Sequence, residues 1–199
     1  MKLILGTAQL GLNYGISKKK PDYKNSIEIL NFCEKNNILT FDTAQGYGNS
    51  EEILSSISNN NDINIITKID FNDRSDMDYI IKSINKSREN LKVKIIDVLL
   101  LHSFKDFKNK TIVNNLIKIK KLGLIKKIGA SVYTVKEAKE ILLDKNFSVL
   151  QIPINYLDYQ WSDPEFQMAV HKSSTEIHCR SIFLQGILIN DFKYWPFYY

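Results

Sequence analysis

The sequence predicts an α/β fold of the (β/α)8-barrel type, on three observations. Segments with strand and helix patterns alternate strictly along the 199-residue chain, an order typical of a parallel sheet with right-handed crossovers. Residues 98–101 are all apolar, as in a strand that helices cover on both faces. Polar residues stand at or just after the ends of five expected strands: Asp42, Lys68, His102, Ser131 and Asn155.

The first half of the chain is expected to form three strand–helix units. Their strands are residues 3–5, which end at Gly6, then 38–43 and 63–67, and their helices are 26–36, a helix starting at Ser50, and 77–91. Ile27, Leu30 and Cys33 share one face of the first of these helices, which places Cys33 in the core. Ser50 is expected to cap the next helix, since acidic residues follow it directly.

The second half repeats this pattern. Its strands are residues 98–101, 128–131, 149–154 and 177–183. Between the first two of them, apolar residues recur at helical spacing from Ile112 to Ile119, and Gly123 ends that helix. Thr134 and Glu137 have the spacing of a capping box. Pro164 is placed at the first position of a last helix.

The polar strand ends decide between two architectures. An open, doubly wound sheet concentrates its site at one switch point, whereas a barrel collects residues from many strand ends at one face. The second pattern fits, so we expect a barrel. About seven strands and six helices are present, and a complete barrel takes about 250 residues. We therefore expect one domain over residues 1–199 that lacks the last helix–strand–helix portion, cut short after the aromatic segment 195–199.

Composition excludes several classes of protein. The chain has 44% apolar and 25% charged residues and a net charge of +5, as in an ordinary globular domain. No apolar run reaches the ~20 residues of a membrane span, and no signal peptide follows Met1, so we expect a cytoplasmic protein. Cys33 and Cys179 lack CxxC spacing, and His171 and His178 lack a matched carboxylate, so we expect no metal site. The lysine runs favour a solvated surface over nucleic-acid binding.

Four side chains at the expected barrel mouth form a chemically consistent set. Tyr47 offers a phenol, Lys68 an ammonium, Asp42 a carboxylate and His102 an imidazole. An ammonium near a phenol is expected to lower the pKa of the phenol, and a carboxylate behind it would hold the ammonium in place. The imidazole can orient a carbonyl group. Because no side chain supplies a hydride, reduction of that carbonyl would require a nicotinamide cofactor.

Residues 42–51, Asp-Thr-Ala-Gln-Gly-Tyr-Gly-Asn-Ser-Glu, resemble the signature of the aldo-keto reductases, and other blocks follow that family in order. These blocks are residues 6–11, 66–68, 97–102, 128–131, 151–156 and 184–188. The resemblance runs from residue 3 to about residue 190 and is to bacterial members. It implies a barrel that binds NADPH (or NADP+) in an extended pose without a Rossmann fold.

The resemblance also implies a role for each matching residue. Tyr47 would be the general acid, Lys68 its pKa-lowering partner, Asp42 the partner of Lys68, and His102 the group that orients the carbonyl. Ser131 and Gln151 would contact the nicotinamide carboxamide. The further residues placed at the cofactor are Gly6, Thr7, Arg180, Gln185 and Gly186.

Two residues depart from the family pattern. Val132 stands where many members have asparagine, and Arg180 stands where many have an aromatic residue that stacks on the nicotinamide. Arginine can also stack on π systems.

The expected function is NADP(H)-dependent reduction of an aldehyde, ketone or sugar carbonyl, with a small-molecule substrate as partner. The alternative is a truncated reductase-like barrel that is inactive or only senses the cofactor. The sequence predicts no oligomeric state.

Overall fold

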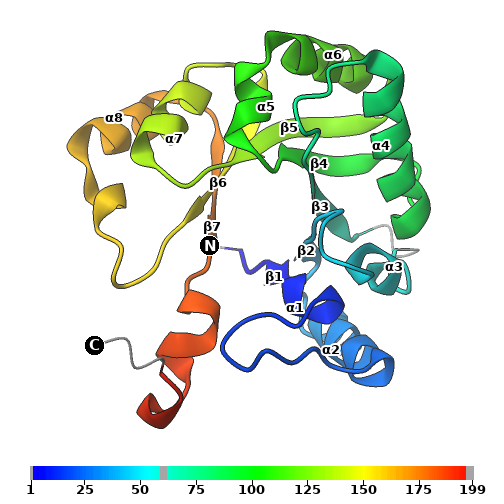
Figure 1. Cartoon of the computed structure of the whole chain (residues 1–199), viewed down its shortest axis with the longest axis vertical. Helices are drawn as coiled ribbons and strands as arrows, with labels where there is room; N and C mark the ends of the chain where they lie inside the picture. The colour runs from blue at the N-terminus through cyan, green and yellow to red at the C-terminus, as the bar shows by residue number, and fades with distance from the viewer. Residues whose placement is uncertain (1, 59–61, 196–199) are drawn as a thin grey trace.

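The computed structural model describes residues 2–58 and 62–195 and contains seven parallel strands in one sheet. The strands follow in sequence order from β1 to β7, as Figure 1 shows. Their bounds are β1 Leu5–Gly6, β2 Thr40–Asp42, β3 Asn64–Ile69, β4 Ile96–Leu101, β5 Ile125–Ser131, β6 Phe147–Pro153 and β7 Glu176–Arg180. Residues 196–199 of the expected aromatic terminus lie outside the described residues.

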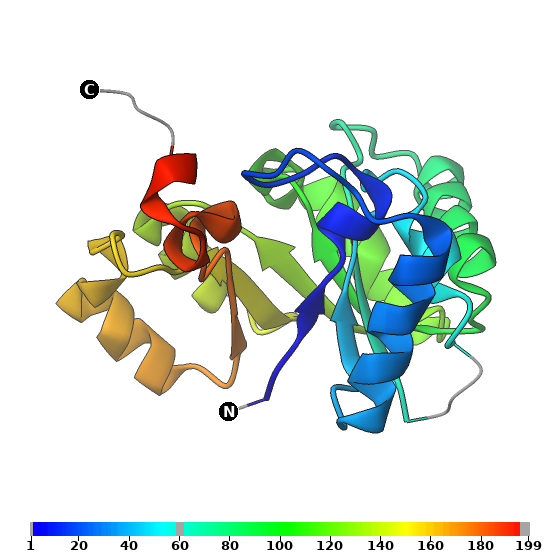
Figure 2. The same ribbon diagram turned by 90° about the horizontal axis from the view of Figure 1, so that it is seen from below.

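Helices cover the outside of the curved sheet (Figure 2). They are α1 Ala8–Gly11, α2 Tyr23–Lys35, α3 Ser50–Leu54, α4 Met77–Leu91, α5 Phe104–Lys108, α6 Lys110–Lys121, α7 Val135–Leu142 and α8 Pro164–Lys172, with 3-10 helices η1 Gln160–Ser162, η2 Leu184–Ile189 and η3 Phe192–Tyr194. In the described part of the chain, β1 and β7 do not pair, so they flank the open side of the barrel. The fold is thus a (β/α)8 barrel without its final unit.

All seven expected strands and all six expected helices are present, and the structure adds the short helices α1 and α5. The expected strand 177–183 is wrong at its end, because β7 stops at Arg180. Ser181 has a φ of 59°, which turns the chain out of the extended conformation. Residues expected to continue that strand lead instead into η2.

The start of α3 also differs from the expectation. Asn49 holds the position before the helix, and no side chain caps its first turn. The hydroxyl of Ser50 instead donates to Thr7, at 2.7 Å from Thr7 Oγ1. The predicted capping box of α7 is confirmed, with Thr134 and Glu137 bonded to each other's backbone.

Two layers fill the inside of the barrel. Ile66, Val98, Leu100 and Val149 form a small apolar cluster. Residues two apart on a strand share a face, so Lys68 follows Ile66, and Gln151 follows Val149, toward the C-terminal end. The apolar layer therefore supports a polar layer at the barrel mouth. A larger cluster packs the sheet against the helices from α4 to α8.

Within the described ranges, the helices lack the combination of length and hydrophobicity needed to cross a membrane.

The loop after β3 depends on one buried carboxylate. Asp106 in α5 is fully buried, and its two oxygens accept the N–H groups of Phe71 at 2.7 Å and Asp73 at 3.2 Å. A backbone N–H left unsatisfied in the interior costs about 1–3 kcal/mol. The carboxylate thus ties α5 to the loop that leads into α4.

We predict that Asp106→Ala lowers the free energy of unfolding by about 2–4 kcal/mol, because one or both of these N–H groups lose their acceptor. Asp78→Ala, at an exposed position in the first turn of α4, should cost less than about 1 kcal/mol. Urea unfolding of both variants measures the difference, and equal losses would contradict this account of the loop.

Candidate active site

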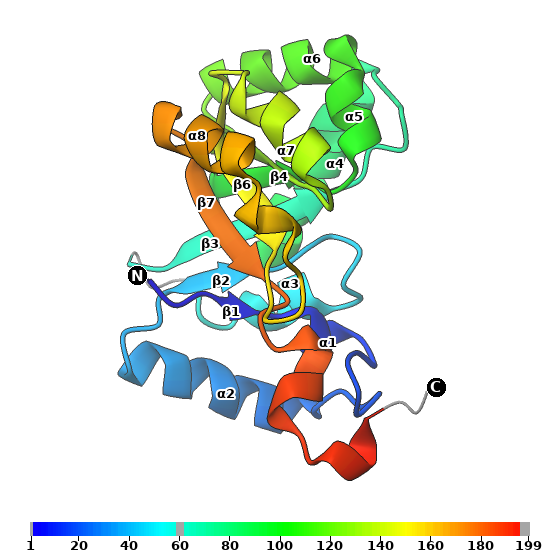
Figure 3. The same ribbon diagram turned by 90° about the vertical axis from the view of Figure 1, so that its left-hand side faces the viewer.

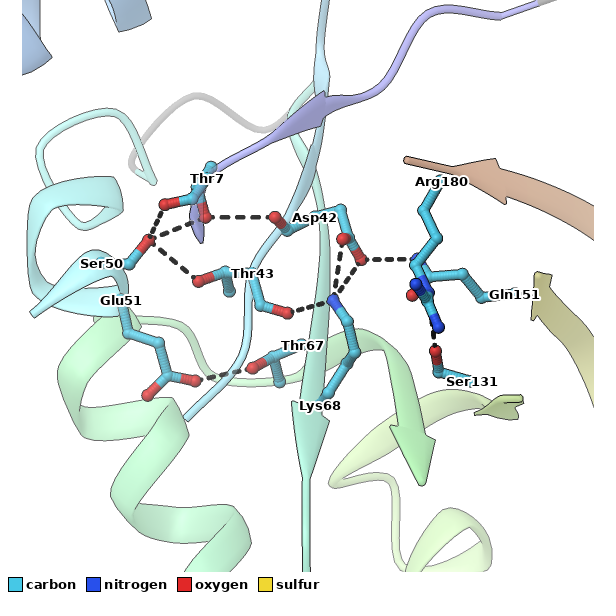
Figure 4. Close-up of polar contacts among 10 residues, drawn as sticks. All are labelled: Thr7, Asp42, Thr43, Ser50, Glu51, Thr67, Lys68, Ser131, Gln151 and Arg180. Atoms are coloured by element: carbon cyan, nitrogen blue, oxygen red, sulfur yellow. Dashed lines mark hydrogen bonds and ion pairs between the residues drawn. The ribbon is translucent and has the colours of Figure 1, made fainter. Parts of the chain in front are cut away.

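The polar residues at the strand ends converge on the barrel mouth, as Figure 4 shows for most of them. Asp42 ends β2, Lys68 lies near the end of β3, and Arg180 ends β7. Ser131 ends β5, and Gln151 is near the end of β6 and pairs with it in register. The parallel sheet places all these carboxyl ends at one face of the barrel, as the sequence predicted.

A buried ion pair forms the centre of this site. The Lys68 Nζ atom lies 2.7 and 2.8 Å from the two carboxylate oxygens of Asp42 and 2.7 Å from the Thr43 carbonyl oxygen. The side chain of Lys68 is only 1% exposed. An ammonium has three N–H donors, and each has an acceptor here. Burial lowers the pKa of Lys68, and Asp42 opposes that shift.

Tyr47 lies in the loop between β2 and α3, against the turn that contains Gly11. A Cβ atom on Gly11 would fall 1.7 Å from the Tyr47 carbonyl oxygen. Gly48 has a φ of 58° and lies against the Gly11 carbonyl. A Cβ atom on Gly48 would fall only 2.4 Å from that carbonyl oxygen. Only glycine fits such contacts, so these two residues set the position of the Tyr47 backbone.

The ring of Tyr47 lies close to both Lys68 and His102. The Lys68 Nζ atom is 5.1 Å from the centre of the phenol ring, and the two rings of Tyr47 and His102 meet edge to face at 5.9 Å. Because all three donors of Lys68 are engaged elsewhere, its influence on Tyr47 is electrostatic.

The pKa of Tyr47 is shifted by its surroundings. Burial raises it well above its ordinary value, and the Asp42 carboxylate raises it further. The Arg180 cation opposes this rise. The phenol is therefore held neutral in this structure, and a lowering of its pKa by Lys68 stays a prediction.

His102 follows β4 and is partly buried. Burial lowers its pKa, and the nearby Lys68 lowers it further. The imidazole is therefore neutral at pH 7 and carries one ring N–H donor. The hydrogen bonds of the described side chains leave that ring unengaged.

Gln151 and Ser131 together offer one free acceptor and one free donor to a ligand. Gln151 donates from Nε2 to Asp42 Oδ1 at 3.0 Å, but its Oε1 atom is buried without a partner in the described structure. Ser131 accepts from Arg180 Nε at 3.3 Å, so its own hydroxyl proton is free to donate. A buried acceptor without a partner is costly, and a bound amide would satisfy it.

Other residues expected at the cofactor lie at the edge of this group. Gly6 pairs with Asp42 in the sheet and is open to solvent. Thr7 is fully buried, and its hydroxyl donates to the Asp42 carbonyl at 3.1 Å, so it holds β1 to β2.

Gln185 and Gly186 lie in η2, which Figure 3 shows beside α1 and the loop after it. There the Gln185 carbonyl accepts the Ile16 N–H at 3.0 Å. The structure therefore places both residues against the loop that follows α1.

Sequence reasoning missed three contributors to the site. The carbonyl of Thr43 is the third acceptor for Lys68. Glu51 is 2% exposed and accepts from Thr67 Oγ1 at 2.7 Å, which fixes α3 against β3. Tyr133 lies under Arg180. Glu51 could have been predicted from its place in the 42–51 motif. The Thr43 carbonyl and the ring of Tyr133 could not, because the sequence does not show which backbone carbonyls or rings contact a given side chain. The side chain of Asn155, the fifth polar residue expected at a strand end, accepts the Leu157 N–H at 2.9 Å.

Comparison with known proteins supports these observations. The model of the aldo/keto reductase family matches residues 2–193. Among solved structures, the chain is similar to an aldo-keto reductase of Bacillus halodurans in its holo form, with a TM-score of 0.80 and 20% identity over 96% of this chain and 65% of that one. A search of curated proteins finds no significant match.

Two more solved structures share the fold. A protein of Pseudomonas aeruginosa described as a putative aldo-keto reductase has a TM-score of 0.75 and 22% identity, over 89% of this chain and 72% of that one. An aldo-keto reductase of Bombyx mori in complex with NADP has a TM-score of 0.69 and 16% identity, over 90% and 62%. The chain thus spans between three fifths and three quarters of the length of these structures.

We predict that Lys68→Met lowers the free energy of unfolding by about 3–5 kcal/mol, because it leaves the Asp42 carboxylate buried without its countercharge. Lys127→Met is the matched control, since it breaks a pair with Glu176 in which both side chains are about half exposed. Its cost should be at most about 1 kcal/mol. Denaturant unfolding that shows the same small loss for both variants would refute the role given to the buried pair.

The pKa of His102 predicts a pH dependence. A histidine whose pKa is lowered by folding binds protons more readily in the unfolded chain, so stability rises with pH in the window just below about 6.5. The free energy of unfolding should fall as the pH is lowered from 7 to 5, and His102→Gln should remove part of that fall. His171→Gln, at an exposed position in α8, is the control, and identical pH profiles for the two variants would refute the assignment.

Proposed function

The chain belongs to the aldo/keto reductase family, and we propose that it is an NADP(H)-dependent oxidoreductase that reduces a small aldehyde, ketone or sugar carbonyl. The observation that carries this proposal is the buried Lys68–Asp42 pair, which lies near the Tyr47 ring and accepts a hydrogen bond from Gln151. Proton donors thus stand next to a place for a redox cofactor.

The residues present fit a nicotinamide carboxamide. That group has an N–H donor for the unpartnered Oε1 of Gln151 and a carbonyl acceptor for the Ser131 hydroxyl. When bound, NADPH supplies the hydride that carbonyl reduction requires. The choice of NADPH is supported by the Bombyx mori relative, which is described in complex with NADP.

Tyr47 is proposed as the proton donor. As a hydride adds to the carbonyl carbon, the π electron pair of the C=O bond moves onto oxygen. The resulting oxyanion is a stronger base than a phenolate, so it takes the proton of the Tyr47 hydroxyl and becomes an alcohol. The raised pKa of Tyr47 keeps this proton in place until that base forms. The phenolate left behind is stabilised by the cations of Lys68 and Arg180 until water returns the proton.

His102 is proposed to orient the substrate. Because its imidazole is neutral, it donates one N–H to the carbonyl oxygen and stabilises the negative charge that develops there. Its ring meets that of Tyr47 edge to face at 5.9 Å, which supports a shared role of the two donors at one carbonyl oxygen. Lys68 and Asp42 act through position and charge, since their hydrogen bonds are made to each other, to the Thr43 carbonyl and to Gln151.

We predict that Tyr47→Phe lowers kcat for an aldehyde by about 100-fold to 10,000-fold, the usual contribution of a positioned proton donor, while NADPH binding is retained. Tyr156→Phe is the matched control, since Tyr156 is 88% exposed. NADPH oxidation followed by absorbance measures both variants. Equal turnover by Tyr47→Phe and wild type would refute the donor role, and bound NADPH without turnover in wild type would favour a cofactor-sensing protein.

A further inference from the structure

Arg180 is a cation fixed at the site by neutral partners. Its Nε atom donates to Ser131 Oγ at 3.3 Å, Nη2 to the Val132 carbonyl at 3.4 Å and Nη1 to Ser181 Oγ at 3.4 Å. The centre of its guanidinium group lies 4.3 Å from the centre of the Tyr133 ring. Figure 4 shows the side chain reaching from the end of β7 toward Ser131. The guanidinium is therefore held in one place.

The charge of Arg180 is not neutralised by a carboxylate. None of the ion pairs among residues 2–58 and 62–195 includes it. Both oxygens of Asp42, the carboxylate of the site, are bound to Lys68, and one of them also accepts from Gln151. Arginine remains protonated at any pH a protein meets. The mouth of the barrel thus holds these two cations and one buried carboxylate, and the exposed carboxylate of Asp70 interacts with His102.

The next step rests on the proposed function. If the nicotinamide carboxamide binds Ser131 and Gln151, the nicotinamide ring lies next to these residues, because the carboxamide is bonded directly to the ring. Since Arg180 donates directly to Ser131, its guanidinium lies within a few ångströms of that ring. The nicotinamide ring carries a positive charge when oxidised and none when reduced.

We propose that Arg180 makes this site discriminate between the two redox states of its cofactor, binding NADPH more tightly than NADP+. Two like unit charges about 5 Å apart repel strongly enough, at the effective dielectric constant of about 20 typical near a protein surface, to change affinity by about tenfold or more. The neutral ring escapes this repulsion and can still stack on the planar guanidinium. The oxidised cofactor is then released readily, which favours carbonyl reduction over alcohol oxidation.

The test compares dissociation constants of NADPH and NADP+ for wild type, Arg180→Gln and Arg180→Lys. NADPH fluorescence and titration calorimetry report binding without turnover, and thermal unfolding confirms that each variant is folded. In wild type, the Kd of NADP+ should exceed that of NADPH by at least about tenfold. Arg180→Gln, which removes the charge, should bring this ratio to within about threefold of one, by tightening NADP+ binding. Arg180→Lys, which keeps the charge, should retain most of the discrimination.

The possible failures are distinguishable. A wild-type ratio near one, or the same ratio in Arg180→Gln as in wild type, would overturn the role of Arg180 while leaving the proposed function intact. A ratio lost equally in Arg180→Lys and Arg180→Gln would also overturn it, since charge would not be the cause. The absence of binding of either cofactor to folded wild type would instead overturn the proposed function.

Discussion

The structure of the barrel mouth depends on the burial of one ammonium group. Lys68 is 1% exposed, and a buried charge is tolerated only when it is paired and fully hydrogen-bonded. The two oxygens of Asp42 and the Thr43 carbonyl meet that requirement, and all come from the end of β2 and the loop after it. Pairing of β2 with β3 in register is thus coupled to formation of the site. The fold and the site are stabilised by the same interaction.

A second set of contacts fixes the position of α3 next to this ion pair. Ser50 bonds to Thr7, and Glu51 accepts from Thr67 and from Asn90, so α3 is fixed against β1, β3 and α4. These contacts hold the loop that carries Tyr47 in the position set by Gly11 and Gly48. Burial then determines the protonation of the site, with a neutral phenol and a neutral imidazole. The site combines neutral proton donors with fixed cations, an arrangement suited to a developing negative charge on a carbonyl oxygen.

The sequence predicted the features that depend on local pattern. The alternation of strands and helices and the polar strand ends were sufficient for the barrel and for the convergence of Asp42, Lys68 and Ser131. Gln151 was expected there only from the family resemblance. Features that depend on distant partners were not predictable. The sequence predicts that Ser50 caps a helix, but its hydroxyl donates instead to Thr7, 43 residues earlier. The end of β7 depends on the backbone turn at Ser181. The pKa of Tyr47 depends on how deeply its loop is buried, which the residue types alone do not show.

The most direct test of this account follows the hydride itself. The 199-residue chain is mixed with NADPH deuterated at the transferred C4 position and a panel of small aldehydes, and the alcohols are analysed by mass spectrometry. We predict deuterium on the former carbonyl carbon, in more than one equivalent per chain. Saturable NADPH binding with no labelled alcohol from any aldehyde would contradict the account, because the site would then hold its cofactor without transferring a hydride from it.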